Sequence, residues 1–457
     1  MPEILINISS WYKTGTVGGT GNSEGQRPVP FLNAHRKISQ KNNQKSYRMP
    51  TLTLTDNPSL NLVRDSVVAR RIESIDLLRG IVMIIMALDH VRHFFHQPAY
   101  FYEPTDLDHT TLSLFFTRWV THFCAPIFVF LAGVSAYLYG VHKTKREVSQ
   151  YLFSRGLWLI FVEVFIIGLG QTFNPAYPYF NLQVIWAIGI SMIALSAMIY
   201  LNRRVMLLIA ILFIAAHNLL DHVHVQGTGG MAFLWSVLHE PSVFKFGRFH
   251  INVMYPVLPW IGILAIGYYL GSLFSTHYDA EKRMKVLILL GFVSMELFLF
   301  LRTLNFYGDS AFWVNQKMGS LTLLAFLNVT KYPPSLLYIL MTLGPALAFL
   351  GLVNGPLNPL AKKILVFGRV PFFYYVVHIY IIHLAAVIAA HISGFGWYNM
   401  ILSERVNHVP ALKGFGYNLL TVYLIWILLM LLLYPICKWY YGYKRAHLPE
   451  QKWLSYM

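Results

Sequence analysis

Apolar runs of about twenty residues recur along most of the chain, and a helix of that length crosses a bilayer. Shorter polar segments separate these runs. We expect transmembrane helices at residues 76–97, 113–140, 152–171, 181–200, 204–220, 253–274, 284–302, 334–354, 365–391 and 417–438. A further apolar run, 230–240, is too short to span and is expected to be re-entrant or interfacial. The pattern predicts an all-α fold, a polytopic membrane helix bundle of about ten transmembrane helices.

Clusters of Lys and Arg fall at only one end of the predicted helices. They precede the first helix and follow the even-numbered ones: Arg70 and Arg71; Lys143, Lys145 and Arg146; Arg203 and Arg204; Lys282, Arg283 and Lys285; Lys362 and Lys363; Lys444 and Arg445. The other loops hold only scattered basic residues. Because short loops rich in Lys and Arg stay in the cytoplasm, the sequence predicts that both termini are cytoplasmic (N-in and C-in).

Composition agrees with a multi-pass protein whose main partner is the lipid bilayer. The 457 residues are 56% hydrophobic and only 12% charged, whereas a soluble domain carries roughly 25% charged residues. The net charge of +16 resides largely in the loop clusters, so no nucleic-acid partner is expected. The two cysteines, Cys124 and Cys437, lie in apolar runs, which excludes a disulfide scaffold.

The chain divides into three parts by composition. Residues 1–70 are rich in Asn, Ser, Thr, Gly and Lys and are expected to form a disordered cytoplasmic tail. Residues 71–445 form the transmembrane domain, and residues 446–457 a second cytoplasmic tail. No basic start followed by an apolar core is present, so no signal peptide is expected. Translation from Met1 or from Met49 stays open.

The first predicted helix carries four ionisable residues, Asp76, Arg79, Asp89 and His90. Such residues are costly in lipid and commonly functional. At about 100° per residue, Arg79 and His90 share one helix face and lie about 16 Å apart along the axis. Asp89 is turned about 100° from His90, so the two are not expected to pair. A cation at one end of the face and an imidazole at the other would suit a substrate that reaches across the bilayer.

Structural interpretations of these residues stay open beside the functional one. Asp76 and Arg79 are spaced as an ion pair at a helix start, and His90 could be a core histidine satisfied by a neighbouring helix. A metal cluster of His90, His93 and His96 is disfavoured because the spacing turns His96 away. No metal is therefore expected.

Other polar residues inside apolar runs are candidates for substrate binding. Arg118 and His122 form an i, i+4 pair in the second helix, and Tyr374 and His378 lie one turn apart in the ninth. Arg369 lies near the predicted cytoplasmic edge, where it could meet phosphates or simply set orientation.

The loops predicted on the outer side add further candidates. Two of them, 221–252 and 303–333, are long and therefore usually functional or disordered. The first is unusually polar and holds Asp221, His222, His224, His239, Glu240, Arg248 and His250. Amide side chains bracket the loop after the third helix and could bind a sugar: Gln171, Asn174, Asn181 and Gln183.

Four stretches together resemble a known family. They are RIESIDLLRG followed by LDH, THFCAPIFVFLAGVSAYLYG, KYPPSLLYILMTLGPALAFLG and FGRVPFFYYVVHIYIIHLA. They resemble bacterial membrane proteins of the heparan-alpha-glucosaminide N-acetyltransferase catalytic-domain family, which is related to the wider superfamily of transmembrane acyltransferases. The resemblance covers about residues 70–440. In that superfamily an Arg, ten residues and a His mark the catalytic helix, and Arg79 to His90 fits this spacing.

The resemblance implies an enzyme of the bacterial inner (plasma) membrane that moves an acetyl or other acyl group across it. Acetyl-CoA would be the donor substrate at the cytoplasmic mouth, and a sugar hydroxyl or amine on the outer side the acceptor. His90 matches the superfamily histidine, Arg79 the motif arginine, and Asp89 belongs to the same run. The lysosomal relative points instead to a histidine in the first loop, for which His109 is the nearest match, so His90 and His109 are rival bases.

The chemistry fits these roles. A histidine suits the deprotonation of an acceptor near neutral pH, and arginines such as Arg79 and Arg369 suit CoA phosphates. No G-x-S-x-G motif is present, which favours direct transfer, although a transient acyl-histidine stays open. A transporter or flippase for a sugar-containing or anionic substrate is the alternative, but no paired halves are evident. A purely structural protein is a third interpretation, which the Arg, Asp and His residues inside the predicted helices disfavour. A homo-oligomer stays open.

Overall fold

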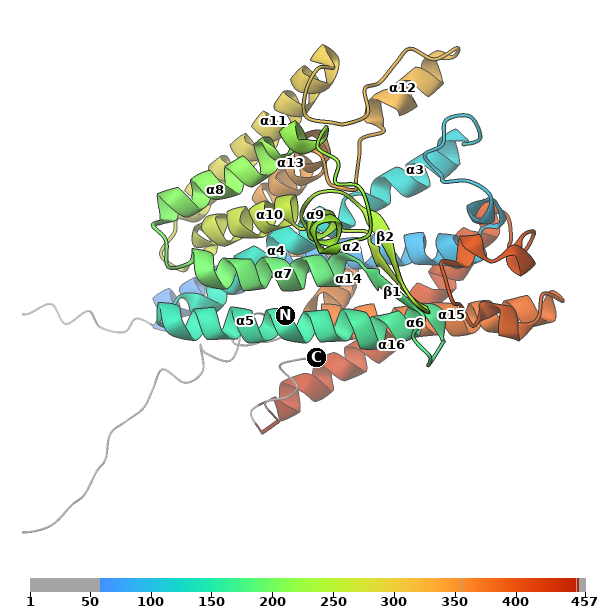
Figure 1. The fold of residues 1–457 in the computed structure, drawn as a ribbon. Helices are drawn as coiled ribbons and strands as arrows, with labels where there is room; N and C mark the ends of the chain where they lie inside the picture. Colours follow the sequence, from blue (N-terminus) through green and yellow to red (C-terminus); the bar gives the residue numbers. More distant parts are fainter. Residues whose placement is uncertain (1–57, 354, 449, 452–457) are drawn as a thin grey trace, which may run out of the picture.

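The computed structural model describes residues 58–353, 355–448 and 450–451, with side chains from Glu73 onward. The described chain is mostly helical, with about 70% helix and 5% strand (Figure 1). The predicted tails lie largely outside the described residues, although residues 58–70 belong to the first helix, α2.

The long helices are α2 (Pro58–Phe95), α3 (Leu112–Thr121), α4 (Cys124–Gly140), α5 (Lys145–Phe161), α7 (Val184–Met198), α8 (Arg203–Ala215), α10 (Leu258–Leu270), α11 (Ala280–Leu304), α13 (Leu336–Leu352), α14 (Pro359–Arg369), α15 (Pro371–Ile392) and α16 (Leu419–His447). Shorter ones are α6 (Gly168–Thr172), α9 (Gly230–Leu238) and α12 (Gly319–Leu327). A π-helical turn, Val162–Ile167, joins α5 to α6.

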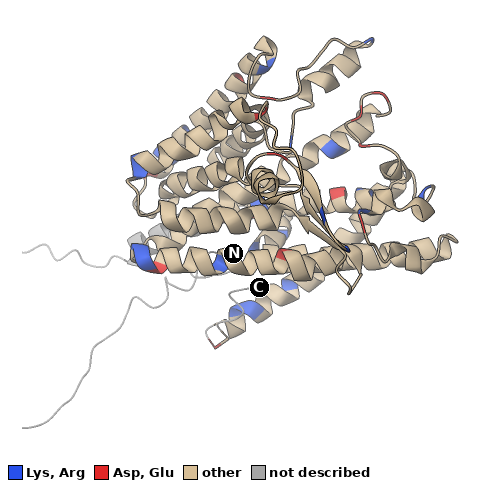
Figure 2. Ribbon diagram, in the orientation of Figure 1, with Lys and Arg blue, Asp and Glu red and all other residues tan. Residues whose placement is uncertain are grey.

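Within the described residues, five helical segments are long and apolar enough to cross a membrane: Leu112–Gly140, Lys145–Thr172, Ala280–Leu304, Pro371–Ile392 and Leu419–His447. Three more apolar helices are shorter: Val184–Met198, Leu258–Phe274 and Leu336–Leu352. The mostly helical fold is thereby confirmed, and the five apolar segments indicate an integral membrane protein, whereas the count of ten spans and the orientation stay predictions. Figure 2 shows Lys and Arg where α5 and α8 begin and where α16 ends, and also on α3 and in the loop beside α12.

The helix predicted over 365–391 is present over Pro371–Ile392 but is not continuous with residues 365–369. The chain instead forms α14 and α15, with Val370 between them at φ −131° and ψ 49°. Proline has no N–H and disfavours helical conformation in the preceding residue, so Pro371 ends one helix and begins the next. The Asn358 side chain accepts from the N–H of Ala361 and starts α14 before the predicted boundary.

A small sheet qualifies the all-α prediction. Strands β1 (Tyr179–Leu182), β2 (Ser242–Phe246) and β3 (Phe249–Val253) pair in the order β1-β3-β2. β1 runs parallel to β3, with Tyr179 opposite His250, and β2 runs antiparallel to β3. Strand β3 (Phe249–Val253) does alternate apolar and polar residues, but only over five positions, whereas β1 and β2 do not alternate. One short run was too little to predict a sheet.

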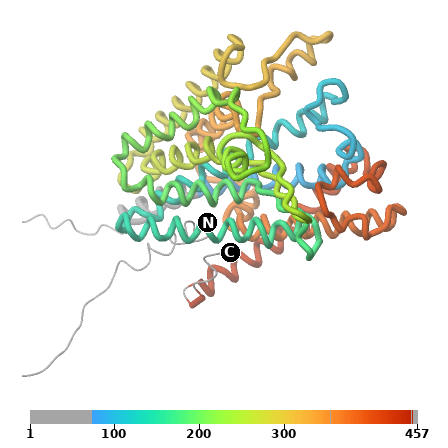
Figure 3. Tube along the Cα trace, in the orientation of Figure 1, coloured from blue at the N-terminus to red at the C-terminus, as the bar shows by residue number. Residues whose placement is uncertain are grey.

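Helix α2 occupies the centre of the bundle. It packs against α3, α4 and α13 and against the C-terminal helices α14, α15 and α16, so the first helix of the described chain is in contact with the last three long ones (Figure 3). The contact with α14 is unusually close. A Cβ at Gly368 would lie 1.8 Å from the carbonyl oxygen of Asp76, and one at Gly80 would lie 2.3 Å from that of Ile364. Two glycines therefore allow the backbones of α2 and α14 to touch.

Candidate functional site

A cavity of about 150 Å³ lies beside the His90 end of α2, and we call it the His90 cavity. Its polar lining comes from segments that are far apart in the sequence: Asp89, His90, Arg92 and His93; Glu103; Arg118 and Thr121; Gln171, Thr172, Tyr179, Asn181 and Gln183; Tyr255; Lys331 and Tyr332; Tyr375; Glu404 and Arg405. Concave sites with converging polar groups are the usual places for substrate binding.

Asp89 forms the charged centre of this cavity. Its carboxylate accepts from Arg92 at 2.9 Å and from Arg118 at 2.5 Å, and its side chain is 19% exposed. Asp89 does not bond to His90, which confirms the prediction from helical geometry. One carboxylate thus holds two guanidinium groups against the cavity, and each guanidinium keeps further donors for a ligand.

His90 belongs to a chain of hydrogen bonds that runs through α15. Its Nδ1 lies 2.7 Å from Nε2 of His378, and Nδ1 of His378 lies 2.9 Å from the carbonyl oxygen of Tyr374. A carbonyl only accepts, so Nδ1 of His378 carries a proton. In neutral His378 the other nitrogen, Nε2, then accepts, and Nδ1 of His90 donates. Nε2 of His90 is left unprotonated, and no described residue hydrogen-bonds to it.

The loop before α13 brings Lys331 and Tyr332 into the cavity. Asp309 fixes this loop by accepting from the backbone N–H of Thr330 and from the hydroxyl of Ser335. Arg302 in α11 donates to the carbonyl oxygen of Ala311, which follows Asp309 closely in the chain. It also donates to three carbonyl oxygens at the end of α12, where the loop begins: those of Ala325, Phe326 and Asn328. These contacts make the loop a fixed wall, with the ammonium of Lys331 5.3 Å from the ring centre of Tyr332.

The β1 end of the cavity supplies neutral polar groups. Asn252 of β3 donates to the Tyr179 hydroxyl and to the amide oxygen of Asn181. Burial raises the pKa of Tyr179, so the phenol remains protonated at neutral pH. Glu163, in the π-helical turn, accepts from the backbone N–H of Gln183 and fixes the start of α7. The expected sugar-binding amides Gln171, Asn181 and Gln183 line the cavity, whereas Asn174 does not.

A second, smaller cavity of about 30 Å³ lies toward the other end of α2, and we call it the Arg79 cavity. Arg79 lines it, but its guanidinium already donates to Asp76 at 2.8 Å, to the carbonyl of Gly368 and to the hydroxyl of Ser135. Arg79 is only 5% exposed. The ion pair with Asp76 agrees with the interpretation of these two residues as a structural pair. Arg79 therefore stabilises this end of the bundle.

The two cavities lie one after the other along the same face of α2. They share three wall residues, Phe128, Val184 and Tyr375. The Arg79 cavity has Met83 in its wall and the His90 cavity has Met86, one turn further along α2. The helix face that Arg79 and His90 were predicted to share therefore lies beside both cavities, with Arg79 lining one and His90 lining the other.

The remaining predicted site residues lie outside both cavity linings. His109 is in an exposed loop, where its Nδ1 bonds to Asp106 and lowers the pKa of that carboxyl. His122 is buried and its carbonyl accepts from Tyr338. Tyr374 and His378 are fully buried and act on the site through the contact between His378 and His90. Arg369, whose side chain is 31% exposed, lies near Glu73 and over the ring of Tyr441.

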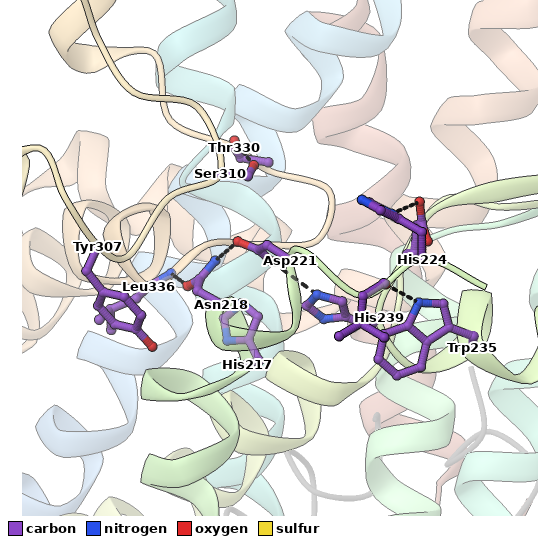
Figure 4. Close-up of polar contacts among 12 residues, drawn as sticks. His217, Asn218, Asp221, His224, Trp235, His239, Tyr307, Ser310, Thr330 and Leu336 are labelled. Carbon is purple, nitrogen blue, oxygen red and sulfur yellow. Dashed lines mark hydrogen bonds and ion pairs between the residues drawn. The ribbon is translucent and has the colours of Figure 1, made fainter. Parts of the chain in front are cut away.

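The polar loop 221–252 builds a separate cluster. Asp221 accepts from His239 at 3.1 Å and from Asn218 at 2.9 Å, and Asn218 in turn accepts from the N–H of Leu336 (Figure 4). Burial raises the pKa of Asp221, but the hydrogen bonds from His239 and Asn218 outweigh it and leave the pKa below its ordinary value. The cluster fastens the loop to the start of α13, and none of its residues lines the His90 cavity.

Sequence reasoning missed several cavity residues. The position of Arg92 could have been predicted. It lies three residues after Asp89, and oppositely charged residues at i and i+3 of a helix commonly pair. Arg405 carried no such signal, because it reaches the cavity from a loop whose position depends on tertiary contacts. Lys331 and Tyr332 open the stretch KYPPSLLYILMTLGPALAFLG that resembles the family, but nothing in the sequence placed them in a site. Tyr375 stands out beside Tyr374 and His378 in the ninth apolar run, but the sequence could not show which side of the helix lines the site.

The fold and these cavities define a helical membrane protein with a polar site buried in its bundle. The sequence model of a family described as "Heparan-alpha-glucosaminide N-acetyltransferase, catalytic" matches residues 71–307, which is more than half of the chain. The chain therefore belongs to this family, which indicates a membrane acetyltransferase. The match includes α2 to α11 and confirms the resemblance over that range. None of the curated proteins compared with the chain matches it.

Proposed function

We propose that this protein is a transmembrane acyltransferase that moves an acetyl group from cytoplasmic acetyl-CoA to a sugar hydroxyl or amine on the outer side of the inner membrane. The observation that carries the proposal is the hydrogen-bonded chain from Tyr374 through His378 to His90 inside a polar cavity. It leaves one nitrogen of His90 as a proton acceptor at the point where cationic and amide groups converge.

In this mechanism Nε2 of His90 removes the proton from the acceptor hydroxyl or amine as that atom attacks the thioester carbonyl. His378 accepts the hydrogen bond from Nδ1 and keeps the ring of His90 in this tautomer and orientation. Arg92 and Arg118, held by Asp89, and the amides near β1 bind the acceptor. His90 then returns the proton to the sulfur of the departing CoA.

The donor would enter from the Arg79 end. Arg369 is the more accessible cation there for the CoA phosphates, since Arg79 is occupied by Asp76, Gly368 and Ser135. Arg79 would then act by shaping the entrance. His109 is a weaker candidate for the base than His90 because its exposed side chain lies outside the cavity lining.

The proposal is tested in proteoliposomes loaded with acetyl-labelled acetyl-CoA, with a panel of amino and neutral sugars outside. We expect labelled acetyl-sugar outside and free CoA thiol inside, both dependent on the protein. Absence of both products with every acceptor, in protein that is folded and inserted, would contradict it.

A transporter or flippase remains the second candidate, because two cavities lie in line along α2 and share a wall. The same vesicles distinguish the two functions. A transporter would move labelled sugar across the membrane without acetyl-CoA and would release no CoA thiol, whereas the acyltransferase requires the thioester.

A further inference from the structure

Tyr375 is the polar member of the wall between the two cavities. It shares that position with Phe128 and Val184, which have no side-chain hydrogen-bonding group. It lies on α15, one turn before His378, and its ring centre is 6.5 Å from that of His90. Any group that passes from the Arg79 cavity to His90 therefore passes the ring of Tyr375.

The hydroxyl of Tyr375 is buried without a hydrogen-bond partner among the described residues. The residue is only 3% exposed. Leaving a buried donor unpaired is unfavourable, and native proteins almost always satisfy such groups. The neighbouring Tyr374 shows the ordinary arrangement, since its hydroxyl donates to the carbonyl oxygen of Met83 at 3.1 Å. An unpaired phenol at the boundary of two cavities indicates a partner that arrives with the substrate.

We infer that the Tyr375 phenol donates a hydrogen bond to the thioester carbonyl oxygen of the acyl donor and to the oxyanion formed from it. This inference rests on the proposed function and adds a catalytic residue to it. Hydrogen-bond donors placed where negative charge develops are often the largest contribution to acyl-transfer catalysis. Its place beside His90 suits this role, because the attacking atom and the oxyanion must lie within reach of the same carbonyl carbon.

In the transfer step, the acceptor oxygen or nitrogen forms a bond to the carbonyl carbon of the thioester as its proton moves to Nε2 of His90. The electron pair of the C=O bond moves to the oxygen, which the O–H of Tyr375 stabilises without transferring its proton. The C=O bond then re-forms, the C–S bond breaks with its electron pair going to sulfur, and the proton on His90 passes to that sulfur.

The test compares Tyr375→Phe with wild type and with Tyr380→Phe as the matched control. Tyr380 also lies on α15 but lines neither cavity, and its hydroxyl donates to the carbonyl oxygen of Ile166 at 2.7 Å. Each substitution removes one phenol hydroxyl from α15. We would measure kcat and KM for acetyl-CoA, donor affinity by calorimetry, and the Tm of the purified protein. For Tyr375→Phe we expect kcat to fall about 10²- to 10³-fold, as for the loss of an oxyanion donor. Its KM should stay within about threefold and its Tm should be unchanged or higher, because an unpaired donor has been removed.

Tyr380→Phe should show the opposite pattern, with a lower Tm and kcat within about threefold of wild type, since it loses an existing hydrogen bond. Normal turnover in Tyr375→Phe, with an active wild type, would overturn the inference and leave the proposed function intact. A fall in Tm equal to that of Tyr380→Phe would also overturn it, because the hydroxyl would then have a structural partner. An inactive wild type would overturn both.

Discussion

Nδ1 of His90 lies 2.7 Å from Nε2 of His378, and the carbonyl of Tyr374 fixes the proton on the far side of His378. A residue in the first helix of the described chain therefore has its tautomer set by a residue 288 positions later. The same logic governs catalytic triads, in which a third group orients the histidine that acts as base.

The role of His378 predicts a graded response to substitution. His378→Leu removes the acceptor for Nδ1 of His90, and we expect kcat to fall roughly 10- to 100-fold, equivalent to about 1.5–3 kcal/mol. His378→Gln places an amide oxygen near the position of Nε2 and should recover part of that loss. Donor KM should stay nearly constant in both. Equal activity in the two variants would contradict a positioning role.

Asp89 is expected to be a stability determinant as well as a site residue. Asp89→Ala leaves the guanidinium groups of Arg92 and Arg118 mostly buried without their shared carboxylate. Losing one partner of a buried ion pair typically costs about 3–5 kcal/mol, so the Tm in detergent should fall clearly. Asp106→Ala, in the exposed loop, is the control and should change stability by no more than about 0.5 kcal/mol. A Tm for Asp89→Ala that matches this control would contradict the arrangement.

The contact between α2 and α14 is testable through Gly368. Its Cβ position lies 1.8 Å from the carbonyl oxygen of Asp76, so Gly368→Ala must push the two helices apart. We expect a loss of about 1–3 kcal/mol or more from overpacking, with weaker acetyl-CoA binding because Arg79 bonds to the Gly368 carbonyl. Gly442→Ala in α16 is the control, since no atom lies within 4 Å of its Cβ position. Thermal unfolding and calorimetry of both variants would show whether the effect is specific.

The orientation of the bundle predicts which loops a reagent reaches. Single cysteines at Lys143, Lys282 and Lys362 should be inaccessible to an impermeant thiol reagent in intact cells and reactive after permeabilisation. A cysteine at His224 in the opposite loop should react in intact cells. The native Cys124 and Cys437 are buried and give little background. Labelling at position 362 from outside would mean that the predicted count of ten helices is wrong.

The sequence predicted those parts of the site that depend on one helix. The spacing of these residues along the helix was enough to place Arg79 and His90 on one helix face. It also placed Asp89 away from that face. It could not show that Arg79 is occupied by contacts from α4 and α14, because those depend on packing between distant segments. The break at Val370 did carry a local signal, Pro371. The sheet carried little, because β1 and β2 do not alternate and β3 alternates over only five residues.

The most direct test of the account compares His90→Ala with His109→Ala in the transfer of label from acetyl-CoA to a sugar acceptor. We expect His90→Ala to lower turnover by about 10²- to 10⁴-fold, the usual contribution of a general base, while it still binds acetyl-CoA in calorimetry. His109→Ala should retain turnover within about threefold of wild type, because its side chain is exposed and lies outside the cavity lining. Normal turnover in His90→Ala, together with loss in His109→Ala, would contradict the assignment of His90 as the base.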